Sequence, residues 1–399
     1  MDSTIFTENF ITRLNQLDLP MQQDLVSTKD IHSKDIALSG SCDMGTITLV
    51  KWLISRNSDI NYCREDGCFP LLCASENGHI DVVKELLLHS ADVNKCNNSD
   101  VSPLSIASQN GHIDVVKELL QYSANVNKCD NDGVSPLYIA SENGHVNVVK
   151  ELLLHSADVN KCTNKDVSPL YIASGYGHVD VVIELLQHSA DVNKCINNGV
   201  SPLWQASQNG HINVVKELLQ HSADVNKCKN DGTSPLQIAC NTNRIEVVRV
   251  LLQCDDVDID LCDDDGCSSL YWASREGHVD VVKELLLHSA DVNKCNNING
   301  VSPLYIASHN EHVDVVKELL QHSADVNKCN NINASHMDML IVVNETVTTL
   351  ADVSNDWILI VLLTKTPFNM SEWHMSESQR HVDVVRNMLQ HSADVISVT

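Results

Sequence analysis

The sequence predicts an all-α solenoid of stacked helix-turn-helix repeats with projecting hairpin-like loops. The first observation is that residues 130–162 read DNDGVSPLYIASENGHVNVVKELLLHSADVNKC, and close copies of these 33 residues recur along most of the chain. The second is that each copy carries start signals, stop signals and apolar spacing for two short helices. A unit of this size buries its apolar face only against neighbouring units, so we expect a stack and not a globule.

The copies align on their closing cysteines, which divide residues 31–329 into nine units. The spacing is constant apart from one added residue in each of two units, beside Asp255 and Asp256 and within residues 296–300. Insertions that fall in loops leave stacked helices undisturbed. The closing cysteines are Cys63, Cys96, Cys129, Cys162, Cys195, Cys228, Cys262, Cys295 and Cys329.

A first helix is expected to begin at Ser135 and Pro136. A serine hydroxyl can accept from unpaired amides at a helix start, and proline suits the first helical position. Gly144 predicts a left-handed stop, after which a second helix begins near Val146. The apolar stripe of this second helix is formed by Val148, Val149, Leu152 and Leu153.

The two ends of the chain differ from the repeat. Residues 1–30 are expected to form a short N-terminal helical cap, because their apolar residues have helical spacing. Residues 31–63 keep the register of the repeat but lack its Ser-Pro pair, which suits an atypical terminal repeat that faces water.

Residues 330–380 are predicted to be an irregular, non-repeat insertion, and residues 381–399 a partial terminal repeat. Two origins stay open for residues 334–380: a repeat whose reading frame has shifted, or a divergent insertion. The codons CAC AAT GGA CAT GTT GAT encode the repeat's His-Asn-Gly-His-Val-Asp. Loss of one A gives His-Met-Asp-Met-Leu, which stands at residues 336–340.

The repeat resembles the ankyrin repeat. That family's pattern is a turn with Gly, then Thr-Pro-Leu-His, two Ala, Gly-His and a closing Ala-Asp-Val-Asn, and residues 31–329 follow it closely. The resemblance implies two antiparallel helices per repeat, a projecting loop, and a curved solenoid whose concave face is made by loops and first helices.

One position departs from the family. Where ankyrin repeats have the His of Thr-Pro-Leu-His, this chain has other residues, so the hydrogen bond that this His makes between repeats is not expected. Aromatic packing is expected in its place. The residues are Leu72, Ser105, Tyr138, Tyr171, Trp204, Gln237, Tyr271 and Tyr305.

Charge and hydropathy restrict the classes of partner. The chain has 53 acidic and 27 basic residues and a net charge of -26, so it should repel phosphate backbones and anionic membranes. The longest apolar run, residues 357–363, is far shorter than the ~20 residues that span a bilayer. We expect a cytoplasmic monomer without membrane insertion or nucleic-acid binding, with a nuclear location left open.

Of the chain's fifteen cysteines, those that close the units are expected to be small, reduced, partly buried side chains. Nine of them occupy one repeat position, where stacked helices lie about 8–10 Å apart, and a disulfide needs Cα atoms closer than about 7 Å. A zinc site needs four converging ligands, and no short CxxC pair occurs.

Repetition also argues against an active site. Ser207, His211 and Asp224 have equivalents in other units, so a catalytic triad of this kind would recur along the chain. We therefore expect a protein that is not an enzyme, with no catalytic residue, no metal site and no cofactor.

The expected function is that of a protein-protein interaction scaffold, which binds a partner protein on the concave face of an ankyrin solenoid. Positions that recur hold the stack, and positions that vary are free to contact a partner or are ordinary solvated surface residues. The family's contact positions lie at the loop tip and after the first helix. Here they are Ser99, Gln109, Asn131, Asp132, Glu142, Asn143, Lys165, Tyr176, Asn198, Gln208, Asp231, Asn241, Asp264, Asp265, Arg275, Glu276 and His309.

A second function class stays open. The chain could be a substrate-recognition adaptor or a fragment of a larger assembly, such as a ubiquitin-ligase receptor or a channel tail, in which the repeats bind and another segment acts. Residues 330–399 contain no recognisable segment for that role. Under the first function, Tyr176 and Arg275 are the expected anchors, because aromatic and arginine side chains dominate many interfaces.

Overall fold

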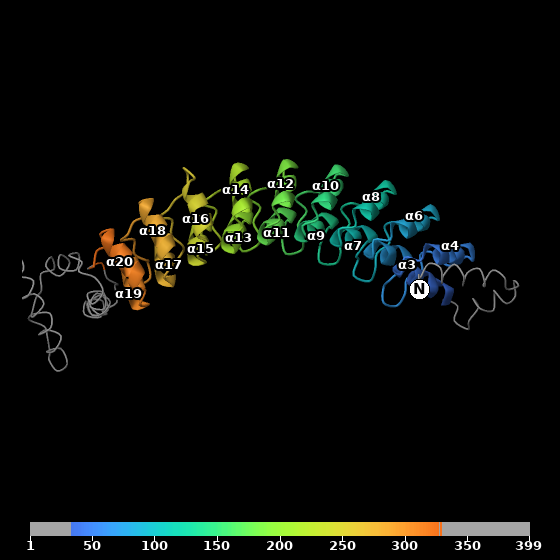
Figure 1. Ribbon diagram of the computed structural model, residues 1–399, viewed down its shortest axis with the longest axis horizontal. Helices are drawn as coiled ribbons and strands as arrows, with labels where there is room; N and C mark the ends of the chain where they lie inside the picture. The colour runs from blue at the N-terminus through green and yellow to red at the C-terminus, as the bar shows by residue number, and fades with distance from the viewer. Residues whose placement is uncertain (1–32, 327, 329–399) are drawn as a thin grey trace, which may run out of the picture.

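A computed structural model of the chain describes residues 33–326 and residue 328. These residues contain eighteen helices and no strand, arranged as successive pairs along one axis (Figure 1). The predicted cap, insertion and partial terminal repeat lie outside the described residues.

The first helices of the pairs pack against one another in chain order, and each also packs against the second helix of its own pair. Their bounds are α3 Ser33–Asp43, α5 Pro70–Glu76, α7 Pro103–Gln109, α9 Pro136–Glu142, α11 Pro169–Tyr176, α13 Pro202–Asn209, α15 Pro235–Asn241, α17 Ser269–Glu276 and α19 Pro303–His309.

The second helices form a parallel row. They are α4 Ile47–Ser55, α6 Ile80–Leu88, α8 Ile113–Gln121, α10 Val146–Leu154, α12 Val179–Gln187, α14 Ile212–Gln220, α16 Ile245–Leu252, α18 Val279–Leu287 and α20 Val313–Gln321. Figure 1 shows the whole as an arc, with the odd-numbered helices on its concave side and the even-numbered ones on its convex side. The predicted all-α solenoid is confirmed.

The helix start and stop signals lie at the positions that the sequence predicted. The Ser135 hydroxyl accepts from the Tyr138 amide at 3.1 Å, and Pro136 is the first residue of α9. Gly144 follows that helix in the left-handed region, at φ 73°. The same serine cap opens α7, α11, α13, α15, α17 and α19.

The core runs continuously along the stack. Leu137, Ala140, Val149 and Leu152 are at most 1% exposed, and their equivalents in the neighbouring units join them in one cluster. Full burial of one such Leu or Val contributes about 1.5–3 kcal/mol. The predicted stripe of the second helix is therefore the side that packs against the first helices and the adjacent pairs.

A ladder of polar side chains connects each unit to the next. The Asn127 carboxamide oxygen accepts from the Asp158 amide at 2.9 Å, and Asn160 accepts in the same way from Asp191 at 2.8 Å. In the first unit the acceptor is the Asp35 carboxylate of α3, which receives the Asp59 amide at 2.7 Å. The terminal unit thus supplies from its own helix what a preceding unit supplies elsewhere.

Hydrogen bonds also bridge units at the position where the family has His, so the sequence prediction that they would be lost is wrong at three sites. Tyr171 donates to the Gln205 side chain at 3.0 Å, and the Trp204 indole donates to the Thr233 carbonyl at 3.1 Å. The Gln237 amide donates to the Cys267 carbonyl at 2.6 Å. Phenol, indole and carboxamide groups all carry the donor that the imidazole would have supplied.

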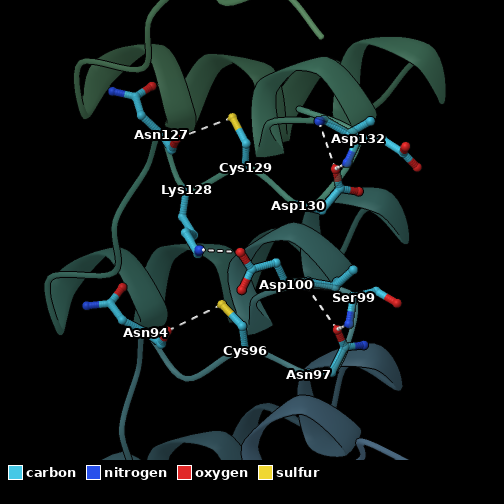
Figure 2. A network of polar contacts seen from close by, with 12 residues as sticks. Asn94, Cys96, Asn97, Ser99, Asp100, Asn127, Lys128, Cys129, Asp130 and Asp132 are labelled. Carbon is cyan, nitrogen blue, oxygen red and sulfur yellow. Dashed lines mark hydrogen bonds and ion pairs between the residues drawn. The ribbon is translucent and has the colours of Figure 1, made fainter. Parts of the chain in front are cut away.

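Eight of the nine closing cysteines lie within the described residues, and all eight are free thiols, as predicted. The Cys96 and Cys129 thiols donate to the Asn94 and Asn127 carbonyls, at 3.5 Å each (Figure 2). A disulfide joins two other cysteines, Cys68 and Cys73, and was not predicted from the sequence.

Replacement of Glu311 by Gly should stabilise the fold. Glu311 occupies the helix-stop position at φ 61°, where most units have Gly, and a side chain in this region costs about 1 kcal/mol or more. We expect a rise in the melting temperature, measured by circular dichroism. Gly277→Ala is the matched control and should lower it, because a Cβ there would lie 2.6 Å from the His312 ring. An unchanged or lower value for Glu311→Gly would contradict the strain.

Gln237→Ala should destabilise the protein by about 2 kcal/mol or more, because it leaves buried main-chain groups without partners. The Gln237 side chain is fully buried, accepts from the Ser234 amide at 2.6 Å, and donates to the Cys267 and Leu261 carbonyls. Urea unfolding measures the change. Gln208→Ala removes the same type of side chain from a partly exposed position and should stay within about 0.5 kcal/mol.

Candidate protein-binding face

From α3 to α17, the last turn of each first helix is fixed through a main-chain carbonyl. The His178 imidazole of one unit donates through Nε2 to the Glu142 carbonyl of the unit before, at 2.9 Å, and His312 donates in the same way to Arg275. Arg244 replaces histidine in one unit and donates through Nε to the Gln208 carbonyl at 2.9 Å. These bonds involve only the carbonyl of the accepting residue and not its side chain.

This series of clamped carbonyls runs along the whole described stack. The accepting residues are Asp43, Glu76, Gln109, Glu142, Gly175, Gln208, Asn241 and Arg275. Their side chains are acidic, basic, amide or absent. The backbone geometry is therefore the same at these positions, although their side chains differ in charge and polarity.

The tips of the loops are also joined to the next unit through main-chain carbonyls. The Asp130 carboxylate accepts from the amides of Asp132 and Val134, at 2.9 Å each, and so closes its loop (Figure 2). The Asp132 carbonyl then accepts from the Asn164 amide of the next loop at 3.0 Å. Equivalent bonds connect the loops at Ser99, Asn198, Asp231 and Asp265. The third loop residue is again held by its carbonyl while its side chain points to solvent.

None of the predicted contact residues is buried. Most are exposed, and Glu142, Gln208 and Asn241 are partly exposed. Tyr176 is 58% exposed and is the most accessible aromatic residue of the described chain. The loops and first helices place them along the concave side of the arc (Figure 1).

Several of these residues, including Asn143, Asn198 and Asp231, also form side-chain bonds that stabilise the fold. The Asn143 amide donates to the Ile139 carbonyl at 2.8 Å, which satisfies the end of its own helix. The Asp231 carboxylate pairs with Lys229 at 2.6 Å and accepts from the Thr233 amide at 3.1 Å. Partial burial would raise the pKa of Asp231, but the bonds from Lys229 and Thr233 outweigh it and lower the pKa.

An apolar stripe on the first helices was missed by the sequence analysis. Ile139 is partly exposed and precedes Glu142 and Asn143 by three and four residues, so it lies on the same helix face as they do. From α7 to α19 its equivalents are also partly exposed. The stripe consists of Ile106, Ile139, Ile172, Gln205, Ile238, Trp272 and Ile306. Variation at Gln205 and Trp272 within a series of isoleucines was the signal that could have revealed it.

Trp272 is the most distinctive member of the stripe. Its indole donates to the Asp263 carboxylate at 2.9 Å, and the Arg275 guanidinium lies over its ring at 5.0 Å from the centroid. Tyr271 meets it edge-on at 5.9 Å. The expected anchor Arg275 is therefore positioned by a tryptophan that was not among the predicted contact residues.

Carboxylates dominate the loops and helix ends of this face. Asp264 and Asp265 are exposed, and within the described chain neither forms an ion pair. Of the basic residues here, Arg64 pairs with Asp66 at 2.7 Å and Lys229 with Asp231. Arg275 lies 3.7 Å from Glu276. The face therefore presents net negative charge around a partly apolar centre.

Between residues 33 and 328, no group of three or more His, Cys, Asp or Glu side chains could hold a metal ion. No helix in that part of the chain is long and apolar enough to cross a bilayer.

The Cys267 thiol should be unusually slow to alkylate. Burial, together with the nearby Asp263 carboxylate, raises the pKa of Cys267 to about 12. At pH 8 only about one thiol in ten thousand is then a thiolate, the form that reacts. With iodoacetamide and peptide mass spectrometry, Cys267 should react at least ~100-fold more slowly in the folded protein than in urea. Equal rates in the two states would contradict this environment.

The comparisons with known proteins agree with this architecture. A family model described as "Ankyrin repeats (3 copies)" matches residues 36–130, 123–195, 189–261 and 255–330, which together cover most of the chain. No curated protein matches the chain significantly. The family model, the paired helices and the linked loop tips lead to one conclusion: the chain belongs to the ankyrin repeat family.

Proposed function

We propose that this protein is a protein-binding scaffold whose partner docks on the concave face, across the loop tips and the last turns of the first helices. Ankyrin repeats are in general protein-protein interaction modules. The proposal adds where on this chain the partner lies and which side chains contact it.

One observation carries the proposal. On this face the bridges between units end on main-chain carbonyls, which are the same in every unit, whereas the side chains of the same residues differ from unit to unit. The carbonyls of Gln109, Glu142 and Arg275 each accept the bridge from the next unit, although their side chains differ in charge and size. The second helices contrast with this, because Lys, Glu, Val and Leu recur there at the same positions in most units. Variation over a constant frame is what recognition of a particular partner requires.

A site-specific crosslinking experiment tests the location. A photoreactive benzoylphenylalanine is placed in the full-length chain at Tyr176, an exposed aromatic residue at the end of the first helix α11, or at Lys216, on the outer helix α14. After irradiation in the native cells, we expect the concave position to capture a defined protein and the outer position not to do so. Capture of the same protein with equal yield at both positions would overturn the proposed location.

Replacing Asp264, Asp265 and Arg275 together by Ala should weaken binding of the captured partner by at least tenfold, because contact residues of this kind contribute the larger share of interface energy. The far-ultraviolet circular dichroism should not change, since these side chains are exposed. The matched control is Lys283→Ala on α18, which should leave the affinity within twofold. Equal weakening by Lys283→Ala would contradict the assignment of the concave face.

A further inference from the structure

We propose that the concave face of units seven to nine, residues 229–310, binds an extended basic segment of a partner protein, with an apolar side chain of that segment against Trp272 and Tyr305. The inference rests on the proposed function and specifies the chemistry of the partner. Three properties of this surface lead to it: an aromatic centre, fixed geometry and unpaired negative charge.

The aromatic centre is continuous across two units. Trp272, Tyr305 and Ile306 are partly exposed and pack against a small cluster of Cys267, Tyr271 and Val301, which is separate from the main core. Large aromatic surfaces that are partly exposed on a repeat protein's inner helices are suited to contact an apolar side chain. Five other units have isoleucine where unit eight has Trp272.

The geometry of this centre is fixed before any partner binds. Trp272 is held by the Asp263 hydrogen bond at 2.9 Å and by Arg275 over its ring. Tyr305 is stacked with His309, with centroids 6.2 Å apart and planes 9° from parallel. Side chains that are already ordered lose little conformational entropy on binding, so contacts made to them contribute more to affinity.

The charge around the centre is negative. Asp264 and Asp265 project from the loop of unit eight, and Glu276 follows at the end of α17. The cations nearest to these carboxylates, on the loops and first helices, are already engaged, because Lys229 pairs with Asp231 and Arg275 lies over Trp272 beside Glu276. A basic segment complements this pattern, whereas an acidic one would be repelled. A second copy of the chain is disfavoured for the same reason, at a net charge of -26.

The loop spacing favours an extended segment. The main chains of adjacent loops are bonded to each other, at 3.0 Å from Asp264 to Asp231 and 2.9 Å from Asn297 to Asp265, so the carboxylates follow the stacking repeat. Stacked helices lie about 8–10 Å apart and an extended chain advances about 3.3 Å per residue. About three residues therefore cover one unit, and about nine cover units seven to nine.

Designed peptides test this chemistry directly. The probe is a fluorescein-labelled nine-residue peptide made of three Lys-Leu-Lys triplets, titrated with the full-length chain and followed by fluorescence anisotropy. The comparison peptides contain Glu-Leu-Glu or Lys-Ser-Lys triplets. We expect the Glu-Leu-Glu peptide not to bind and the Lys-Ser-Lys peptide to bind at least ~10-fold more weakly than the probe. Equal binding of the Lys-Ser-Lys peptide would overturn the apolar contact.

Variants of the chain locate the probe. Trp272→Ile introduces the residue that most other units have at this position, and it should weaken binding of the probe peptide by about 10-fold. Asp264→Asn with Asp265→Asn should weaken it by a similar factor and reduce its dependence on salt. The matched control is Asp180→Asn with Asp280→Asn, which removes the same charge from exposed positions on α12 and α18 and should change the dissociation constant less than twofold.

The outcomes separate the two proposals. Equal weakening by both neutralised pairs would show attraction to net charge alone and overturn the inference. An unchanged affinity for Trp272→Ile, in protein that melts like the original, would do the same. If the probe peptide does not bind, but substitutions on the concave face still weaken binding of the captured partner, the proposed function stands. Only the inference that the partner segment is basic and apolar is then overturned.

Discussion

Each unit of this protein can bury its apolar side chains only against the units before and after it. Leu137 and Val149 have no other core to enter, and they are fully buried because neighbouring pairs cover them. Every other feature depends on this constraint. The clamps and ladders can form only when two units are already stacked at a fixed distance, and the concave face exists only as the sum of successive units.

Two sets of hydrogen bonds fix the position of each unit relative to the next. The asparagine ladder joins Asn127 to Asp158 in the segments that follow the second helices, and the imidazole bridges, such as His178 to Glu142, join successive units at the ends of the first helices. Apolar contacts are not directional, so they alone would allow a unit to slide or rotate. Hydrogen bonds at two separated points restrict both motions.

The sequence was sufficient for features encoded within one unit. The Ser135 cap, the Gly144 stop and the stripe around Val149 follow from local rules, and so does the left-handed backbone at Glu311. Features that join two units could not be predicted in this way. The side chain of Gln237 donates to the Cys267 carbonyl of the following unit, and this bond depends on a distance that only the assembled stack defines. The indole bond of Trp272 to Asp263 lies within one unit, but it spans nine residues and depends on how the loop folds back on the helix.

The clamp that accepts through a main-chain carbonyl has a consequence for how such a chain can change over time. His178 contacts an oxygen atom that every amino acid possesses, so the neighbouring unit is indifferent to the side chain displayed at Glu142. Units can therefore be duplicated, exchanged or reordered along the array while their junctions still fit. The variable side chains of the concave face are therefore carried by a constant backbone. New combinations of them can arise by recombination between copies without a new fold.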